Sequence, residues 1–201
     1  PEGVIVDYQG AAQQQKDAFG SLGLAMMIGF LLVYLIMVAL YESAVYPLVV
    51  MFSIPVALIG ALLALALSMQ SLTIFAIVGL IMLMGLVAKN GILLVDFTNH
   101  LKEKGYALKD ALIEAGRERL RPILMTTVAM IFGMLPIALS KGSGAEVKNG
   151  MAWVIIGGLT SSLLLTLVIV PTMYYIIDKL KERVNHLFSK KRVKKREEIT
   201  V

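Results

Sequence analysis

A lysine and an asparagine stand side by side inside an apolar run that reaches from about Leu72 to Phe97. They are Lys89 and Asn90, in the segment "GLVAKNGILLVDF". A lone charge at the middle of a bilayer costs on the order of 3 kcal/mol on insertion scales, and a lysine can snorkel only part of the distance to the interface. We therefore expect Lys89 to face a polar interior and to have an acidic partner. The alternative is a structural lysine that snorkels or binds backbone carbonyls.

Two further polar residues are candidates to act together with Lys89. Asp96 shares its helix face but lies about 10 Å further along the axis, which is too far for a direct ion pair. A solvated interfacial carboxylate explains Asp96 slightly better than a role in proton access. Thr126 lies near the start of the predicted span 123–140, which runs back through the membrane. This direction brings Thr126 to a depth similar to that of Lys89. A membrane threonine usually bonds the carbonyl four residues before it, but Thr126 is also a candidate to bond Lys89 or a shared water.

The sequence offers little other chemistry. It has no cysteine, so it has neither a disulfide framework nor a thiolate metal site. Thioethers can bind Cu(I), but the two histidines, His100 and His186, are not near the methionines, which we interpret as packing residues. No phosphate-binding loop, Ser-His-Asp set or metal-ligand cluster is visible. We therefore expect no metal, no cofactor and no catalytic residues.

Composition and patterning indicate a membrane protein. Of the 201 residues, 58% are hydrophobic and 16% are charged, whereas a soluble domain is about half apolar and about one quarter charged. The apolar residues gather in runs of roughly 18 or more, which are long enough to cross a bilayer as helices. We predict an all-α bundle with five spanning helices, at about 20–40, 47–68, 72–97, 123–140 and 151–177.

Basic residues predict the orientation of these helices. Lysines and arginines gather in the connection 99–121 and in the tail after residue 178, whereas 41–46 and 69–71 have none. Positively charged loops stay in the cytoplasm, so we place 99–121 and the tail inside and 69–71 and 141–150 outside. The N-terminus then lies outside and the C-terminus inside, as five spans require.

Small residues and an amphipathic connection complete the predicted bundle. Three rows of small residues would let neighbouring helices approach closely. They are Gly60 with Ala64 and Ser68, Gly157 with Ser161, and Gly158 with Ser162. Leu108, Leu112 and Ala115 share one face, which predicts a short helix lying on the cytoplasmic membrane surface. The strand-like "VIVDY" near the N-terminus cannot bury a core alone, so we expect the chain to be a piece of a longer polypeptide.

Several spaced motifs match one known family. "ALYES", "GLVAKNGILLVDF", "RERLRPILMTT" and "GGLTSS" follow one another along the chain. It resembles the second membrane half of the resistance–nodulation–division (RND) transporters, in their hydrophobe/amphiphile multidrug-efflux branch. The resemblance covers nearly the whole chain. It implies a secondary active transporter and not an enzyme: a trimeric, twelve-helix inner-membrane subunit that imports protons to export drugs, with a periplasmic adaptor and an outer-membrane channel.

The resemblance also implies a division of the chain. Residues 1–17 would end the periplasmic porter region and link it to the membrane, 18–178 would form the transmembrane bundle, and 179–201 would be a basic cytoplasmic tail. The periplasmic domains that bind drugs in this family are absent from these residues. The chain alone is therefore expected neither to pump nor to select a drug.

Roles for single residues follow from the same resemblance. In the family, the lysine of the "KN" pair binds two aspartates on the fourth helix, in the half that is absent here. When a proton neutralises them, the lysine loses its attraction and can turn toward the neighbouring asparagine or the threonine after "RPILM". The resemblance thus assigns Lys89, Asn90 and Thr126 to a proton relay, and Asp96 and Arg119 to a possible cytoplasmic proton path.

Two alternatives stay open at this point. A member of the same superfamily that exports metal or lipid would share these motifs, and the absent periplasmic domains would decide between them. A non-transporting membrane scaffold or secretion component could share the helix bundle. An acidic pair placed to meet Lys89 in the missing half would count against a scaffold.

Overall fold

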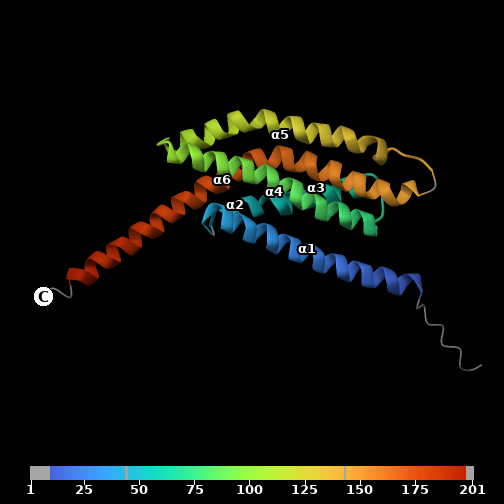
Figure 1. Cartoon of the computed structure of the whole chain (residues 1–201), viewed down its shortest axis with the longest axis horizontal. Helices are drawn as coiled ribbons and strands as arrows, with labels where there is room; N and C mark the ends of the chain where they lie inside the picture. Colours follow the sequence, from blue (N-terminus) through green and yellow to red (C-terminus); the bar gives the residue numbers. More distant parts are fainter. Residues whose placement is uncertain (1–9, 44, 143, 198–201) are drawn as a thin grey trace, which may run out of the picture.

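The computed structural model describes residues 10–43, 45–142 and 144–197 of the chain (Figure 1). For residues 11, 12, 146 and 181–197 it describes the backbone alone. The segment predicted to be strand-like, near the N-terminus, lies outside the described residues, as does the very end of the basic tail.

Helices account for the regular structure of the described residues, which contain no strand. They are α1 (Ala11–Tyr41), α2 (Val45–Met51), α3 (Ser53–Leu67), α4 (Ile74–Glu103), α5 (Leu108–Ala138) and α6 (Ala145–Glu197). Five segments are long and apolar enough to cross a membrane: Gln13–Tyr41, Val45–Leu67, Ile74–Glu103, Leu108–Ala138 and Val147–Leu180. The prediction of an all-α fold with five spanning helices is confirmed.

The second span is divided into α2 and α3 by a break at Phe52. Pro55 explains the position of the break, because it has no N–H for the carbonyl of Met51 and its ring crowds that carbonyl. The hydroxyl of Ser53 donates to the carbonyl of Val50 at 2.6 Å. The carbonyl of Val50, beside the break, therefore still accepts a hydrogen bond, as an apolar environment requires.

The connection after α4 differs from the prediction. The stretch predicted as a separate surface helix is the first part of α5, which continues through Pro122 into the fourth span. The predicted apolar face of this segment is buried. Leu112 and Ala115 lie in one cluster with Leu94 of α4, and Leu108 packs against that cluster. This face lies against the bundle and not on the membrane surface, because packing on α4 and α6 buries it more completely.

α6 lies in the middle of the bundle, against α3, α4 and α5 (Figure 1). Its closest contact is with α3. A Cβ added to Gly60 would overlap Ser161, and one added to Gly157 would overlap Ala64. The hydroxyl of Ser161 also donates to the carbonyl of Val56 at 3.2 Å. These predicted small residues therefore form a real helix contact.

The next residues along α6 face a different helix. A Cβ at Gly158 would overlap the side chain of Leu83 on α4. One turn further, the buried hydroxyls of Ser162 and Thr166 are 3.0 Å apart and bond each other. Neighbouring glycines thus let α6 approach two helices at once.

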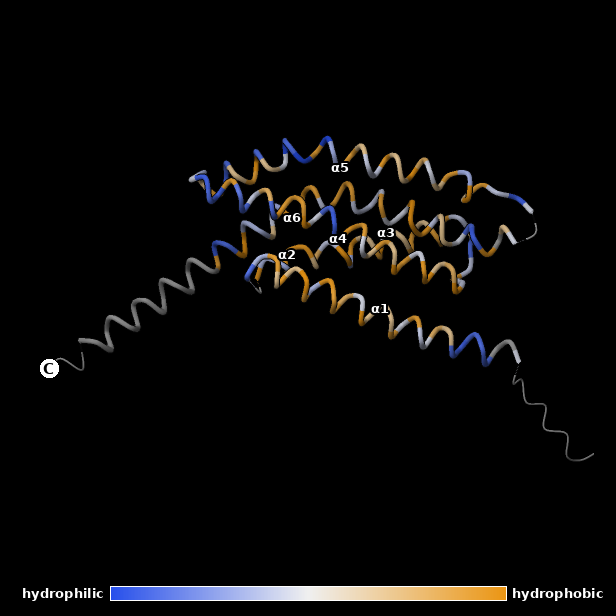
Figure 2. The backbone as a smooth tube through the Cα atoms, viewed as in Figure 1, coloured by the Kyte–Doolittle hydropathy of each residue, from blue (hydrophilic) through white to orange (hydrophobic). Residues whose placement is uncertain are grey.

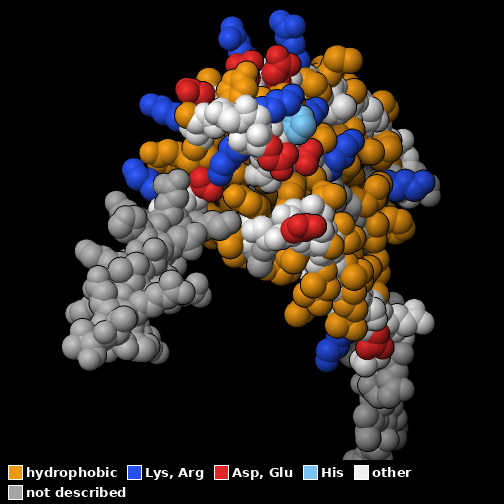
Figure 3. All heavy atoms as spheres, turned by 60° about the vertical axis from the view of Figure 1, so that its left-hand side comes forward, with side chains coloured by type: hydrophobic (Ala, Val, Ile, Leu, Met, Phe, Trp, Pro, Cys, Tyr) orange, Lys and Arg blue, Asp and Glu red, His pale blue; other side chains and the backbone are white. Residues whose placement is uncertain are grey.

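Hydrophobic side chains cover the sides of the bundle. Figure 2 shows apolar residues in the middle of the helices and polar residues near their ends. In Figure 3 the Lys, Arg, Asp and Glu side chains gather at one end of the bundle, and hydrophobic side chains cover the surface beside them. Large apolar residues such as Met27, Leu67 and Met125 are strongly exposed. Such a surface is suited to lipid contact and not to water.

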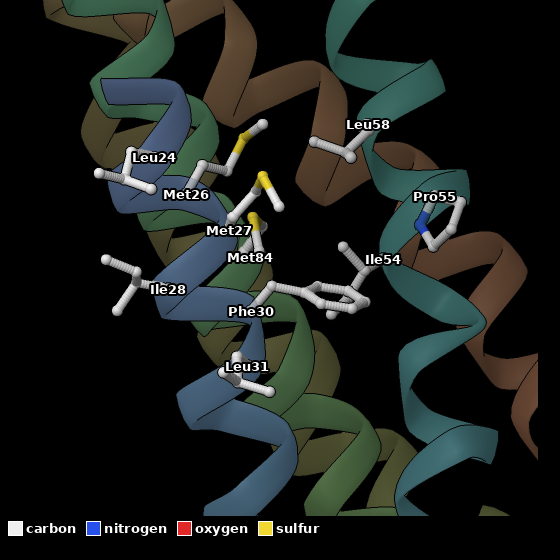
Figure 4. Close-up of a pocket in the computed structure, with 10 residues that line it drawn as sticks. All are labelled: Leu24, Met26, Met27, Ile28, Phe30, Leu31, Ile54, Pro55, Leu58 and Met84. Atoms are coloured by element: carbon white, nitrogen blue, oxygen red, sulfur yellow. The ribbon is translucent and has the colours of Figure 1, made fainter. Parts of the chain in front are cut away.

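α1 lies at the edge of the bundle, where it packs on α4 and α2 (Figure 1). An apolar groove of about 510 Å³ separates it from α3. Figure 4 shows Met26 and Met27 of α1, Met84 of α4 and Ile54 of α3 directed into this groove. Among the methionines that line this groove, Met84 is buried as a packing residue would be, whereas Met27 is strongly exposed.

Replacing Gly157 by alanine is expected to destabilise the bundle by about 1–3 kcal/mol, because its methyl group would overlap Ala64. Gly133→Ala is the matched control, since a Cβ there meets nothing within 4 Å. Thermal unfolding in detergent would measure both variants. Equal melting temperatures would contradict the assigned α3–α6 contact.

Candidate functional site

Lys89 lies on a face of α4 that no other described helix covers. Met82, Gly85, Lys89 and Asp96 are all exposed, and their spacing places them along one side of the helix. We call these four residues the open stripe. Within the described residues, Lys89 has no hydrogen bond and no ion pair. The acidic partner expected for Lys89 is therefore not among them, and its charge faces outward from the five-helix unit.

Asn90 points to a different side of α4. Its side chain is buried, with 4% of the residue exposed, whereas Lys89 is exposed. Adjacent residues on an α-helix are about 100° apart. The side chain of Lys89 therefore faces outward from the bundle, whereas that of Asn90 faces inward. Asn90 lies among residues that pack inside the bundle.

Thr126 bonds its own helix. Its hydroxyl donates to the carbonyls of Pro122, at 3.0 Å, and Ile123, at 3.2 Å. No hydrogen bond joins it to Lys89 in the described part of the chain. Its neighbour Thr127 is fully buried, and the Thr127 hydroxyl has no hydrogen-bond partner among the described residues. The expected local bond of a membrane threonine is present at Thr126, and the unpartnered Thr127 hydroxyl was not predicted.

Asp96 and Arg119 lie on different sides of α4. Asp96 lines a polar cavity of about 300 Å³ between the end of α1 and α4, together with Tyr41 and Asn99. The hydroxyl of Tyr41 donates to the carbonyl of Ile92 at 2.9 Å. Asp96 therefore occupies a polar cavity at the charged end of the bundle.

The guanidinium of Arg119 lies over the ring of Phe97, 4.5 Å from its centroid. The Arg119 Nε is buried and has no hydrogen-bond partner within the described residues. Phe97 follows Asp96, so a rotation of about 100° around α4 separates the arginine from the cavity. The structure does not bring the two predicted path residues together.

A polar network that was not predicted joins α4 to α6. The Nζ of Lys102 is 3.0 Å from Oδ1 and 2.9 Å from Oδ2 of Asp178. Asp178 is buried, with 7% of the residue exposed. The hydroxyl of Tyr46, on α2, donates to Asp178 Oδ1 at 3.4 Å. One buried carboxylate thus connects three helices.

Tyr174 supports this network from α6. Its ring stacks on that of Tyr46, with centroids 5.2 Å apart and an interplanar angle of 14°. The ammonium of Lys102 lies 5.5 Å from the centroid of the Tyr174 ring, and the Tyr174 hydroxyl donates to the side-chain oxygen of Asn99. We call Tyr46, Asn99, Lys102, Tyr174 and Asp178 the polar clamp.

The described residues contain no group of three His, Cys, Asp or Glu residues that could hold a metal ion. α4 carries two charged features: an exposed ammonium on the open stripe, and a buried ion pair near the C-terminal end of the helix. Such groups can hold or release a proton, and can attract or free a neighbouring helix.

Known proteins resemble most of this chain. The model of the AcrB/AcrD/AcrF family matches residues 1–178. The chain is 40% identical over 184 residues to the swarming motility protein SwrC of Bacillus subtilis, which is 91% of the chain and 18% of that protein. It is 40% identical over 185 residues to the multidrug resistance protein MdtC of Yersinia enterocolitica, covering 92% of the chain and 18% of that protein. MdtC of Pantoea ananatis is 40% identical over 184 residues, with 91% and 18% covered.

Asp178→Asn is expected to lower the free energy of unfolding by about 3–5 kcal/mol, because it leaves the Lys102 ammonium without its buried partner. Asp96→Asn, the matched control, is expected to change it by no more than about 0.5 kcal/mol, since Asp96 is exposed. Denaturation in detergent would compare the two variants. A destabilisation of equal size would refute the role of the buried pair.

Proposed function

The chain belongs to the AcrB/AcrD/AcrF family and is a membrane part of a resistance–nodulation–division transporter, and we propose that the full transporter exports hydrophobic or amphiphilic compounds in exchange for protons. The chain spans less than one fifth of the length of its curated relatives. Two of these relatives are named multidrug resistance proteins, which supports export of drug-like compounds. The whole would be a secondary active transporter and not an enzyme.

One observation carries the proposal: Lys89 is an exposed charge in the middle of a spanning helix. On insertion scales such a charge costs on the order of 3 kcal/mol when lipid surrounds it. The open stripe is therefore a poor lipid-facing surface, although it is a good surface for a helix that brings carboxylates. The rest of the transporter is long enough to supply that helix, and we assign it the acidic partners of Lys89.

Proton binding would then switch the contact at Lys89. Ionised carboxylates hold the ammonium strongly in a low-dielectric interior. Protonation removes that attraction, and Lys89 turns toward another polar group. Thr126 is suited to receive it, since its exposed hydroxyl bonds only carbonyls of its own helix. Asn90 supplies a second polar group on α4, at the inner side of the same turn.

We give Asp96 and Arg119 separate roles in proton transfer between this site and the charged end of the bundle. Asp96 lies on the open stripe and lines the polar cavity beside Tyr41. Arg119 lies on the opposite flank, with a buried Nε that has no partner among the described residues. Protons would pass between the cytoplasm and Lys89 along the side of α4 that carries Asp96, with Arg119 holding the local charge balance.

The same proposal covers orientation and assembly. The charged end seen in Figure 3 would lie in the cytoplasm, with the N-terminus of the chain in the periplasm. The transporter would sit in the bacterial inner membrane as a homotrimer, with a periplasmic adaptor and an outer-membrane channel as partners. Membrane lipid would cover the outer surfaces of α1 and α5.

Lys89→Met in the full-length transporter is expected to reduce export by about a hundredfold, since it removes the charge that senses protonation. Efflux of a fluorescent lipophilic cation from proteoliposomes, driven by a pH gradient, would measure it. Lys109→Met is the matched control, because Lys109 is an exposed lysine outside the open stripe. Wild-type export by a folded Lys89→Met protein would overturn the proposal.

Thr126→Val is expected to slow export by about tenfold, as losing one hydrogen bond to a charged group does, and Thr126→Ser should retain it. Thr172→Val is the control, because Thr172 is also exposed and bonds only the carbonyl of Val168 on its own helix. Equal rates for the two valine variants would exclude Thr126 from the relay. The same efflux assay serves, with protein abundance measured in each membrane.

A further inference from the structure

We propose that the polar clamp is a fixed anchor, which holds one end of α4 against α6 and α2 throughout the transport cycle. When protonation changes the contacts of Lys89, α4 tilts about that end. The inference rests on the proposed function and adds positioning residues to it, Lys102 and Asp178. These residues touch neither Lys89 nor the open stripe.

The clamp is built to stay closed. A single ammonium bonds both oxygens of Asp178, at 3.0 and 2.9 Å, and the Asp178 side chain is only 8% exposed. Opening it would leave a carboxylate buried without its partner, which is far costlier than separating a surface pair. The rings of Tyr46 and Tyr174 stack on each other beside the ion pair, and the Lys102 ammonium also lies over the Tyr174 ring.

The far end of α4 is held by a different kind of contact. There, Gly79 packs against Met151, and Leu83 packs against Gly158. These contacts are close but apolar, so a shift between the helices there breaks no interhelical hydrogen bond among the described residues. A buried ion pair at one end and apolar packing at the other make the clamp the pivot of α4.

The position of Lys89 suits a lever of this kind. Lys102 lies about 20 Å beyond Lys89 along the helix axis, at 1.5 Å per residue. The Lys102 side chain points inward to α6, whereas Lys89 points outward on the open stripe. A force on Lys89 therefore acts about 20 Å from the anchor. It displaces the N-terminal end of α4 more than the end that holds Lys102.

Two crosslinks test the anchor in the full-length transporter. The chain has no cysteine, so introduced ones are the only thiols within it. Cysteines at Lys102 and Asp178, bridged by a short bismaleimide, are expected to hold α4 on α6 as the ion pair does and to export within about twofold of the wild type, whereas the unbridged double variant exports less. Cysteines at Gly79 and Met151, joined by a disulfide, are expected to stop export until a reductant restores it. Each single-cysteine variant, treated with the same reagent, controls for modification without bridging.

The outcomes separate the anchor from the function on which it rests. Loss of export on bridging positions 102 and 178, in a transporter that still depends on Lys89, overturns the anchor. Unchanged export with the 79–151 disulfide formed overturns it as well. Export that is indifferent to Lys89→Met refutes the proposed function instead.

Exchange of the charges provides a test that needs no crosslink. Lys102→Asp and Asp178→Lys are each expected to lower export at least tenfold, because each places two like charges together. The double exchange is expected to recover export to within about threefold of the wild type, with protein abundance measured in each case. Failure of the double variant to improve on either single one, at equal abundance, contradicts the anchor.

Discussion

The bundle depends on how closely α6 approaches α3 and α4. Lipid chains are as apolar as leucine, so helices in a membrane associate through packing and hydrogen bonds and gain little from the hydrophobic effect. Gly60 and Gly157 remove the side chains that would separate α3 from α6, and Gly158 does the same on the side of α4. Once α6 lies in this position, its later turns reach α2 and the last turn of α4. The buried ion pair of Lys102 and Asp178 is therefore a consequence of glycine contacts about six turns away along α6.

A second constraint is that polar groups inside a membrane need partners. Most of those described here have local ones: Ser53 and Thr126 bond carbonyls of their own chain segment, and Ser162 bonds Thr166. Asp178 satisfies the constraint over a long distance in sequence, through Lys102. Lys89 contrasts with them, since the described residues give it no partner. The need of polar groups for partners thus explains the hydrogen bonds inside the bundle. It also identifies the open stripe as the surface where a partner is missing from the described residues.

Much of this could be predicted from the sequence, because long apolar runs and small-residue rows are local signals. The five spans and the close approach of helices at the rows of small residues belong to this class. The polar clamp was missed, since Lys102 is one of several lysines in a basic connection and Asp178 stands where an apolar run simply ends. In the structure, every fourth residue of α6 from Gly150 is buried, and the series ends at the aspartate. Its members are Gly150, Val154, Gly158, Ser162, Thr166, Val170, Tyr174 and Asp178. A four-residue spacing drifts around a helix of 3.6 residues per turn, so no single-face pattern could show it. For Lys89 the sequence predicted only that an acidic partner is needed, and the described residues contain none that contacts it.

The break at Phe52 has a counterpart on the helix beside it. It lies between Tyr46, which reaches the end of α6, and Val56, which accepts a hydrogen bond from the middle of α6. Pro171 lies between the partners of these two residues on α6, and it too has no N–H to donate. Two antiparallel helices therefore lack part of their backbone ladder at the same height. The α3–α6 pair is therefore easier to bend at that level, whereas α4, which passes Val50 at Gly91, continues through it as an unbroken helix.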